Sequence, residues 1–259
     1  MRTISSLSEF KKFRDSLSGN IGLIPTMGAL HDGHLSLVNQ SNQNCDHTIV
    51  SIFVNPTQFA QGEDLKTYPR SLEKDLALLE TCNVDAIFLP TNEIMYPGGF
   101  STFINEVDIS KGLEGKSRPT FFRGVTTIIA KLFNIINPTH AFFGEKDAQQ
   151  LRIIQKLVND LNYSIQVVSC PIIREKNGLA MSSRNNYLSV SERSIAATIY
   201  KSLEHGKNII LSGERNSQLI RDIITRSINA ENLLQLEYVS VADSTTLLEI
   251  SGKISGEII

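Results

Sequence analysis

Two histidines in a glycine-containing turn are the residues best suited to chemistry. His31 and His34 are three positions apart in Pro25–His34 (PTMGALHDGH), which follows a short apolar run and opens a helical pattern. Residues three apart share a face in the first turn of a helix, and the unpaired N–H groups of a helix N-terminus attract phosphate. A neutral imidazole there can donate hydrogen bonds to phosphate oxygens as negative charge builds on them. The segment therefore predicts a phosphate site.

Two other interpretations of this pair remain open. An HxxH pair can hold zinc, although no convincing third ligand follows it in the chain. One histidine could instead cap the helix while the other lies in the core. Gly28 and Gly33 permit close approach of a ligand to the backbone, and the turn joins a strand to a helix, so we favour the phosphate site. The glycine spacing differs from the GxGxxG pattern of dinucleotide-binding enzymes.

Three further segments carry side chains suited to binding. In Gly144–Asp147 (GEKD), Lys146 suits a phosphate and Asp147 a ribose hydroxyl. Met181–Asn185 (MSSRN) offers two hydroxyls and a guanidinium on a polar segment that could close over phosphates. The amides of Asn55–Phe59 (NPTQF) both donate and accept, which suits a hydroxylated, carboxylated substrate. Taken singly, these could be a solvated turn, a polar linker and an Asx-Pro turn.

Short apolar runs alternate with helical patterns in the first two-thirds of the chain, which predicts a Rossmann-like, doubly wound parallel sheet. Ligands of such sheets bind beyond the carboxyl ends of the strands, so we expect His34 and Lys146 to face one crevice. The expected strands are Ile21–Ile24, Thr48–Val54, Ala86–Leu89, His140–Phe143 and Ile165–Ser169. The expected helices are His34–Cys45, Ser71–Cys82, Gly124–Ile136 and Asp147–Leu161.

The pattern changes after Pro171, so we expect a first domain over 1–172 and a smaller α+β domain over 173–259, which begins with the MSSRN hinge loop. A capping box at Ser189 should open a helix that runs to about Leu211. A helix over Ser217–Ile228 and a strand over Leu236–Ala242 should follow. At Gly256–Ile259 we expect a strand in progress and a few tens of further residues.

Composition restricts the class of protein. The 259 residues are 41% hydrophobic and 20% charged, close to the globular average, and the net charge of -2 argues against a broad nucleic-acid interface. Cys45, Cys82 and Cys170 are odd in number and far apart, which favours a reducing compartment. The N-terminus lacks the apolar core of a signal peptide, and no run approaches the ~20 apolar residues of a membrane span. We expect a soluble, cytoplasmic protein.

The order of the motifs carries more information than any one of them. PTMGALHDGH, IFVNPTQF, YPR, FRGV, FFGEKDAQQL and GLAMSSRNNYL follow one another between about Leu23 and Leu188. This order resembles the pantothenate synthetase family of the HIGH/KMSKS nucleotidyltransferase superfamily. The resemblance implies an enzyme that joins (R)-pantoate to β-alanine through a pantoyl adenylate, with ATP converted to AMP and pyrophosphate. It also implies Mg²⁺ held mostly by ATP oxygens, and a homodimer.

The resemblance also implies roles for individual residues. His34, His31 and Lys146 would be catalytic. Gln58 would lie between pantoate and β-alanine, and Gln150 would hold pantoate. The remaining substrate-binding candidates are Asn55, Arg123 and Tyr68, and Asp75 is the expected neighbour of Mg²⁺. The implied ATP-binding residues are Pro25, Thr26, Met27, Gly28, Ala29, Leu30, His31, Asp32, Gly33, His34, Gly144, Glu145, Lys146, Asp147, Ile173 (through its backbone, to adenine), Met181, Ser182, Ser183 and Arg184.

Three other functions remain as alternatives. An adenylyltransferase of the same superfamily would leave AMP in the product, but its acceptor phosphate would call for Arg or Lys where this chain has Gln58 and Gln150. An aminoacyl-tRNA synthetase would need a longer chain and a basic surface. A non-catalytic nucleotide-binding protein would have no need of the histidines, Lys146 and the Ser-Ser-Arg segment together.

Overall fold

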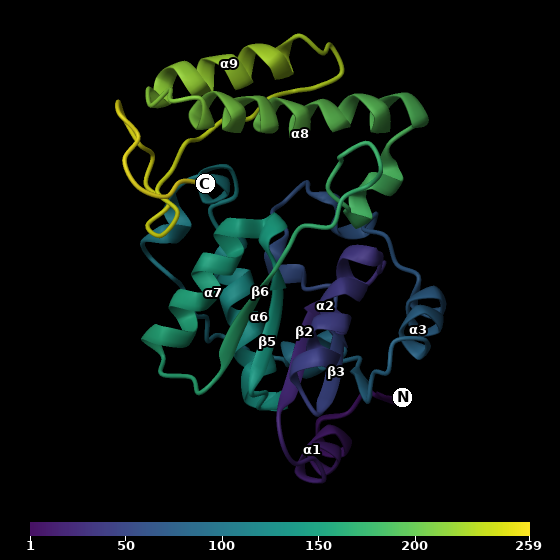
Figure 1. Cartoon of the computed structure of the whole chain (residues 1–259). Helices are drawn as coiled ribbons and strands as arrows, with labels where there is room; N and C mark the ends of the chain where they lie inside the picture. Colours follow the sequence, from purple (N-terminus) through teal and green to yellow (C-terminus); the bar gives the residue numbers. More distant parts are fainter.

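The computed structural model describes residues 1–259 and is built around one six-stranded sheet (Figure 1). All strand pairs are parallel, and the order is β1-β4-β3-β2-β5-β6. The expected parallel α/β sheet is therefore confirmed. The strands are β1 (Arg2–Ile4), β2 (Ile21–Thr26), β3 (His47–Ile52), β4 (Ala86–Phe88), β5 (His140–Gly144) and β6 (Gln166–Cys170).

Both faces of the sheet are apolar and covered by helices. Because successive strand side chains point to opposite faces, Leu23 and Ile24 of β2 enter different apolar clusters, and neither is exposed. The cluster with Leu23 contains side chains of α1 (Leu7–Asp15), α6 (Phe121–Ile136) and α7 (Ala148–Asp160). The cluster with Ile24 contains side chains of α2 (Asp32–Asn44) and α3 (Leu72–Glu80). Burial on both faces explains the nearly continuous hydrophobic runs of the strands.

The topology switches direction at β2. This strand pairs with β3 on one side and with β5 on the other. The connection from β2 to β3 runs through α2, whereas the connection that enters β5 runs through α6 on the opposite face. The loops after β2 and β5 therefore separate at their carboxyl ends, which is where open α/β sheets bind ligands.

The C-terminal part stands above the sheet, and its regular elements are helices joined to long irregular segments (Figure 1). Helices α8 (Val190–Leu211) and α9 (Ser217–Asn229) lie side by side, and Ile220, Ile224 and Ile228 contribute to a separate apolar cluster. The predicted strand over Leu236–Ala242 is wrong. No other strand runs beside it, and only isolated bridges form, such as Ala242 with Glu249. The domain boundary near residue 172 stays a prediction.

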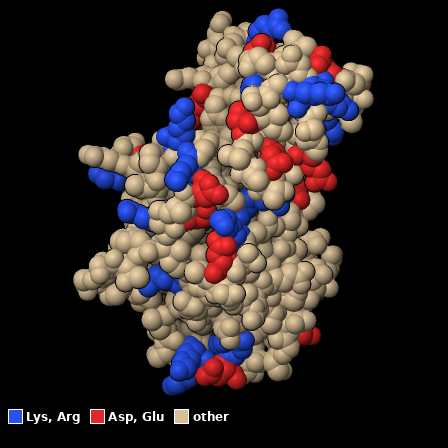
Figure 2. Space-filling model, turned by 90° about the vertical axis from the view of Figure 1, so that its left-hand side faces the viewer, with Lys and Arg blue, Asp and Glu red and all other residues tan.

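At Gly256–Ile259, where a strand was also expected, only an isolated bridge of Ile258 with Asp243 forms. The remaining predicted strands and helices are present with their ends shifted by a few residues. Sequence reasoning missed β1 and α1, which are short and close to the N-terminus. It also missed several one-turn elements: α4 (Asn92–Met95), α5 (Glu114–Ser117), and the 3₁₀ turns η1 (Pro56–Gln58), η2 (Asp64–Lys66), η3 (Ile109–Lys111), η4 (Glu145–Asp147) and η5 (Ser183–Tyr187). None of the helices has the length and apolar character to cross a membrane. On the face seen in Figure 2, acidic and basic side chains are interspersed.

Candidate active site

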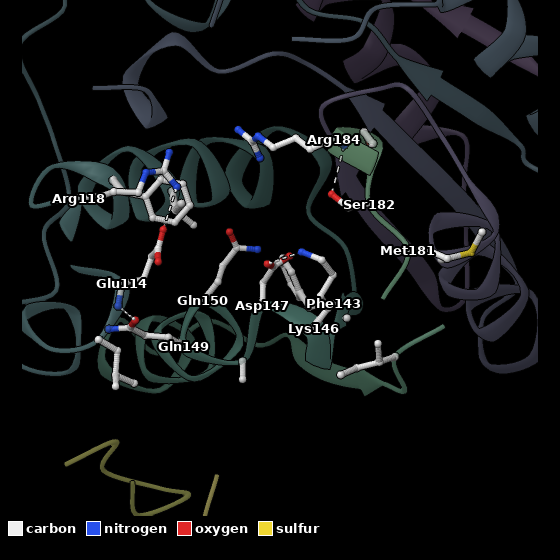
Figure 3. Close-up of a pocket in the computed structure, with 18 of the residues that line it drawn as sticks. Glu114, Arg118, Phe143, Lys146, Asp147, Gln149, Gln150, Met181, Ser182 and Arg184 are labelled. Atoms are coloured by element: carbon white, nitrogen blue, oxygen red, sulfur yellow. Dashed lines mark hydrogen bonds and ion pairs between the residues drawn. The ribbon is translucent and has the colours of Figure 1, made fainter. Parts of the chain in front are cut away.

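A cavity of about 910 Å³ lies beyond the carboxyl ends of β2 and β5 and extends beneath the C-terminal part. It brings His34 and Lys146 to one crevice, as expected from the two strand-to-helix turns. Many of the candidate residues line it, and Figure 3 shows a group of them. Those that line the cavity are Pro25, Thr26, Met27, His31, Gly33, His34, Gln58, Tyr68, Gly144, Lys146, Asp147, Gln150, Ile173, Met181, Ser182, Ser183 and Arg184.

The two histidines are held by their own loop. His31 precedes α2, and its Nδ1 accepts a hydrogen bond from the Gly33 amide at 3.1 Å. The Nδ1 of His34 accepts in turn from the amide of His31 at 3.3 Å. Both Nδ1 atoms are thus acceptors, so in the neutral rings the proton is on Nε2. Each ring keeps an Nε2–H donor outside the cap, and the ring centroids are 4.1 Å apart.

The surroundings keep both rings neutral. Burial, together with the nearby His31 and Lys146, lowers the pKa of His34 to about 3. Burial also lowers the pKa of His31, with Lys146 as the next cause. A neutral ring is the form that fits the capping bonds, because an imidazolium has no acceptor nitrogen. At neutral pH the positive charge at this end of the cavity therefore comes from Lys146 and from the α2 N-terminus.

Asp75 shapes the same loop from α3. It is 2% exposed, and its carboxylate accepts hydrogen bonds from the amides of Ala29 at 2.8 Å and Leu30 at 2.7 Å. These bonds stabilise a turn in which Gly28 and Ala29 have positive φ values of 82° and 51°. Asp75 does not line the cavity. The structure thus gives Asp75 the role of holding the turn, and its position beside Mg²⁺ stays a prediction.

The NPTQ turn places one amide in the cavity and buries the other. Asn55 is 1% exposed, and its Oδ1 accepts from the amide of Thr57, which orients the group. Its Nδ2 donates to the carbonyl of Gly124 at 3.1 Å and to Oε1 of Gln58 at 2.8 Å. Gln58 consequently has its Nε2 donor left for a ligand. The structure therefore places the Asn55 amide against Gln58 and Gly124, outside the cavity, where it orients Gln58.

The close approach of α6 to this turn depends on a missing side chain. A Cβ atom at Gly124 would lie 2.3 Å from the carbonyl oxygen of Thr57. No side chain fits in that space, so glycine allows the helix to touch the turn. This contact explains why the FRGV motif has glycine at position 124. It also brings the carbonyl of Gly124 within hydrogen-bonding distance of Asn55.

The adjacent glutamines of α7 also divide their roles. Gln149 is 8% exposed, and its Nε2 donates to the carbonyls of Ile109 and Gly112, both at 2.8 Å. Its Oε1 accepts from the amide of Glu114 at 3.0 Å. Gln149 therefore fixes the segment before α6, whereas the side chain of Gln150 points into the cavity (Figure 3).

The segment after β6 is more ordered than its polar sequence suggested. It forms a small hairpin, with a bridge between Arg174 and Ala180 and a bond from the Met181 amide to the Ile173 carbonyl. Ser183 is 6% exposed, and its hydroxyl donates to the carbonyl of Ala29 at 3.0 Å. The hairpin thus ties the Ser-Ser-Arg segment directly to the histidine turn.

The two arginines around the start of α6 differ from expectation. Arg123 is exposed, lies over the ring of Phe103 at 4.9 Å and does not line the cavity, so the structure does not place it at the expected substrate site. Arg118 lines the cavity instead. One signal could have identified it. A crossover helix runs antiparallel to the strands, so residues just before α6 lie at the edge of the sheet where the site is.

The remaining candidates support the loops without lining the cavity: Gly28, Ala29, Leu30, Asp32 and Glu145. Leu30 belongs to an apolar cluster, Asp32 is exposed in the first turn of α2, and Glu145 accepts from the Ser169 hydroxyl at 2.7 Å. Their backbone groups shape the turns, which accounts for their presence in the motifs.

Comparison with known proteins identifies the family. The model of the pantoate–β-alanine ligase family matches residues 1–259. The chain belongs to this family. A pantothenate synthetase of Acetivibrio thermocellus is 50% identical, over 98% of this chain and 92% of the relative. One of Thermotoga petrophila is 48% identical, over 95% of this chain and 89% of the relative.

Solved structures of the ligase family have the same architecture. A pantothenate synthetase from Thermus thermophilus has a TM-score of 0.93 and is 39% identical, over 99% of this chain and 92% of that one. A pantoate–β-alanine ligase from Francisella tularensis, solved with β,γ-ATP and β-alanine, has a TM-score of 0.77 and is 38% identical, over 88% and 86% of the chains. The resemblance stated from the motifs is therefore confirmed.

Proposed function

We propose that this chain condenses (R)-pantoate with β-alanine, using ATP and releasing AMP and pyrophosphate, through an enzyme-bound pantoyl adenylate. The observation that carries the proposal is the arrangement of His31 and His34. Two neutral rings point Nε2–H donors away from their capping bonds, beside Lys146, at the switch point of the sheet. Donors at that place suit a triphosphate whose α-phosphorus is attacked.

In the first half-reaction, the carboxylate of pantoate attacks the α-phosphorus of ATP and pyrophosphate leaves. Negative charge grows on the phosphate oxygens as this bond forms. The Nε2–H groups of His31 and His34 and the ammonium of Lys146 would stabilise that charge in the transition state more than in the ground state, and so act mainly on rate. Arg184, next to Ser183, which bonds to the histidine turn, would bind the outer phosphates.

In the second half-reaction, the amine of β-alanine attacks the acyl carbon of the adenylate, and AMP leaves. The amide of Gln58 faces the cavity with its Nε2 donor, because Oε1 is occupied by Asn55. This donor would orient pantoate or its acyl oxygen. Gln150 points into the same cavity and would hold the pantoyl group from the side of α7.

Mg²⁺ would enter with ATP. No three His, Cys, Asp or Glu side chains gather in a way that could hold a metal ion. Both oxygens of Asp75 are bound by backbone amides. Mg²⁺ binds substrate phosphates readily and keeps several waters, so the ion would neutralise phosphate charge while the residues described above hold the nucleotide.

Compartment and assembly are further parts of the proposal. We infer a cytoplasmic enzyme, which the three free cysteines support. We also infer a homodimer, on the resemblance to the family. Light scattering during size-exclusion chromatography tests the dimer, since a mass of one chain at working concentrations would contradict it.

Product analysis tests the reaction. Incubation with ATP, pantoate and β-alanine should give pantothenate, AMP and pyrophosphate in equal amounts. Pantoate alone should support exchange of pyrophosphate into ATP, because the adenylate forms before β-alanine reacts. Exchange that requires β-alanine would contradict the two-step order, and AMP found within the organic product would point to an adenylyltransferase.

A further inference from the structure

Arg118 lies beside Gln58, the residue expected between the two organic substrates, and takes no part in the reaction steps described above. Its Nη2 donates to the backbone carbonyl of Gln58 at 3.1 Å. Its guanidinium lies 3.9 Å from the centroid of the Phe121 ring, and its side chain is 20% exposed. A cation stacked on an aromatic ring at a cavity wall is held in position and partly desolvated.

The guanidinium already binds one carboxylate in a two-pronged manner. Its Nε donates to Oε1 of Glu63 at 2.7 Å, and its Nη2 donates to the other oxygen of the same carboxylate. Glu114 is a weaker partner, at 3.5 Å from Nη1. Parallel N–H donors of this kind match the geometry of any carboxylate. The fork of Arg118 is therefore a carboxylate site that Glu63 fills from within the chain.

Glu63 follows a glycine whose surroundings leave room for another position of the segment. Gly62 has a φ of 92°, and the space around it is open. The next residue, Asp64, forms the same kind of pair with the other cavity-lining arginine: Arg184 donates to both of its oxygens at 2.9 Å. Adjacent acids thus occupy the forks of two arginines, one of which is expected to bind ATP phosphates.

We propose that Arg118 binds the carboxylate of β-alanine, and that Glu63 is the internal partner which this carboxylate displaces. The inference rests on the proposed function. β-Alanine is a short molecule, so when its amine approaches the acyl group near Gln58, its carboxylate remains within a few ångströms. Arg118 is bonded to the backbone of that same residue. The site would accept an amine that carries a carboxylate at this distance and reject one without it.

The carboxylate of pantoate fits this site less well. This carboxylate must act as the nucleophile in the first step. Two hydrogen bonds from an arginine to its oxygens would make it a weaker nucleophile. After that step it is joined to AMP as an acyl phosphate and no longer carries the carboxylate charge. The carboxylate of β-alanine takes no part in bond formation and survives in the product. A permanent cation at the cavity wall therefore suits β-alanine.

The test compares two substitutions that break the same ion pair. Arg118→Gln should raise the KM for β-alanine on the order of 10- to 100-fold, and should reduce pantoate-dependent pyrophosphate exchange much less. Glu63→Gln should lower that KM severalfold, because it removes the competitor. A pair with a merely structural role would make both variants worse in the same direction. Arg123→Gln is the matched control, since Arg123 is an exposed arginine outside the cavity.

A substrate analogue separates recognition from damage. The wild-type protein should use β-alanine far better than propylamine, which lacks the carboxylate, and Arg118→Gln should narrow this ratio while Arg123→Gln keeps it. The inference is overturned if Arg118→Gln keeps the wild-type ratio of β-alanine use to propylamine use while pantoate-dependent pyrophosphate exchange is intact. If Arg118→Gln does not fold, Arg118→Lys replaces it in the same comparison. The direction in which Glu63→Gln changes the KM for β-alanine is then the second test: a lower KM supports the inference and a higher KM contradicts it. Absence of exchange in the wild-type protein would contradict the proposed function itself.

Discussion

The cavity has two sides that hold their polar groups in different ways. On the histidine side (His31, His34 and Lys146), the rings are fixed by hydrogen bonds within one loop, and their Nε2–H donors remain free. On the arginine side (Arg118 and Arg184), each guanidinium is paired with an acid of one surface segment. The two histidines are ready for a ligand before it arrives, whereas Lys146, which pairs with Asp147 at 3.1 Å, and both arginines must exchange partners.

The difference fits what each side has to do. Groups that stabilise a transition state are most effective when they need no reorganisation during the reaction. Groups that only bind a substrate can be paired with a residue of the protein beforehand, because the substrate replaces that residue before the chemical step starts. Arginines left unpaired at a cavity wall would carry an uncompensated charge, which is costly in a partly desolvated place.

The largest expected effect follows from breaking the histidine side. His34→Ala should reduce adenylate formation on the order of 10²–10³-fold, as for loss of one preorganised donor. Conversion of supplied pantoyl adenylate and β-alanine should fall much less, because charge then develops on the acyl oxygen. His31→Ala should show the same asymmetry more weakly.

Rapid-quench measurement of each half-reaction checks this asymmetry. His205→Ala, which changes a histidine of α8 outside the cavity, is the control and should leave both rates unchanged. Equal losses in the two half-reactions of His34→Ala would mean that the ring positions the pantoyl group or supports the fold.

A second substitution tests how far preorganisation extends into the pantoate site. In Asn55→Asp the buried carboxylate cannot donate to Gln58, so the Gln58 amide should rotate and present its oxygen to the cavity. Use of pantoate should weaken by about 1–3 kcal/mol, similar to Gln58→Ala, while ATP binding changes little. The KM for pantoate and the dissociation constant of an ATP analogue measure the two effects. A KM for pantoate unchanged in Asn55→Asp contradicts the orienting role.

The neutral histidines should also appear in the pH dependence of stability. The pKa of His34 is about 3 in the folded protein, below its ordinary value of 6.5, so the unfolded chain binds the proton more readily. Stability is therefore complete above about pH 6.5 and falls as the pH is lowered, by about 2 kcal/mol at pH 5 from this residue. Urea unfolding at several pH values measures the slope. His34→Asn keeps an acceptor for the cap and should flatten it, whereas an unaltered slope would show that the ring is not held neutral.

The same division explains what could be predicted from the sequence. The histidine turn and the GEKD turn are local patterns, each a short apolar run followed by a turn and a helix, and the parallel sheet then brings them together. Gln58 and Gln150, which motif order predicts to bind the organic substrates, also line the cavity. These features depend on residues close in the chain or on a topology that strand and helix alternation predicts.

The roles that were missed depend on contacts between distant segments. Asn55 donates to the carbonyl of Gly124, 69 positions away, and Arg118 donates to Glu63 across 55 positions. Spacing in the sequence does not reveal such pairs. The strand expected over Leu236–Ala242 failed for a related reason: its apolar alternation was present, but a strand forms only where a neighbour supplies hydrogen bonds.

The smallest expected effect concerns the exchange at Arg184. Its pair with Asp64 is partly exposed, with 44% and 23% of the two side chains accessible, so breaking it should change free energies by no more than about 1 kcal/mol. Because ATP must displace Asp64, Asp64→Asn should bind an ATP analogue up to about fivefold more tightly at the same conditions.

The segment around Arg184 should also be cleaved faster by trypsin in the free variant than in the free wild-type protein. Bound analogue and pantoate should remove this difference, since the phosphates then hold the guanidinium. Asp160→Asn, which breaks the exposed pair with Lys156 on α7, is the control for a general change in charge. Weaker nucleotide binding in Asp64→Asn would mean that Asp64 presents the arginine to ATP, and that both sides of the cavity are preorganised.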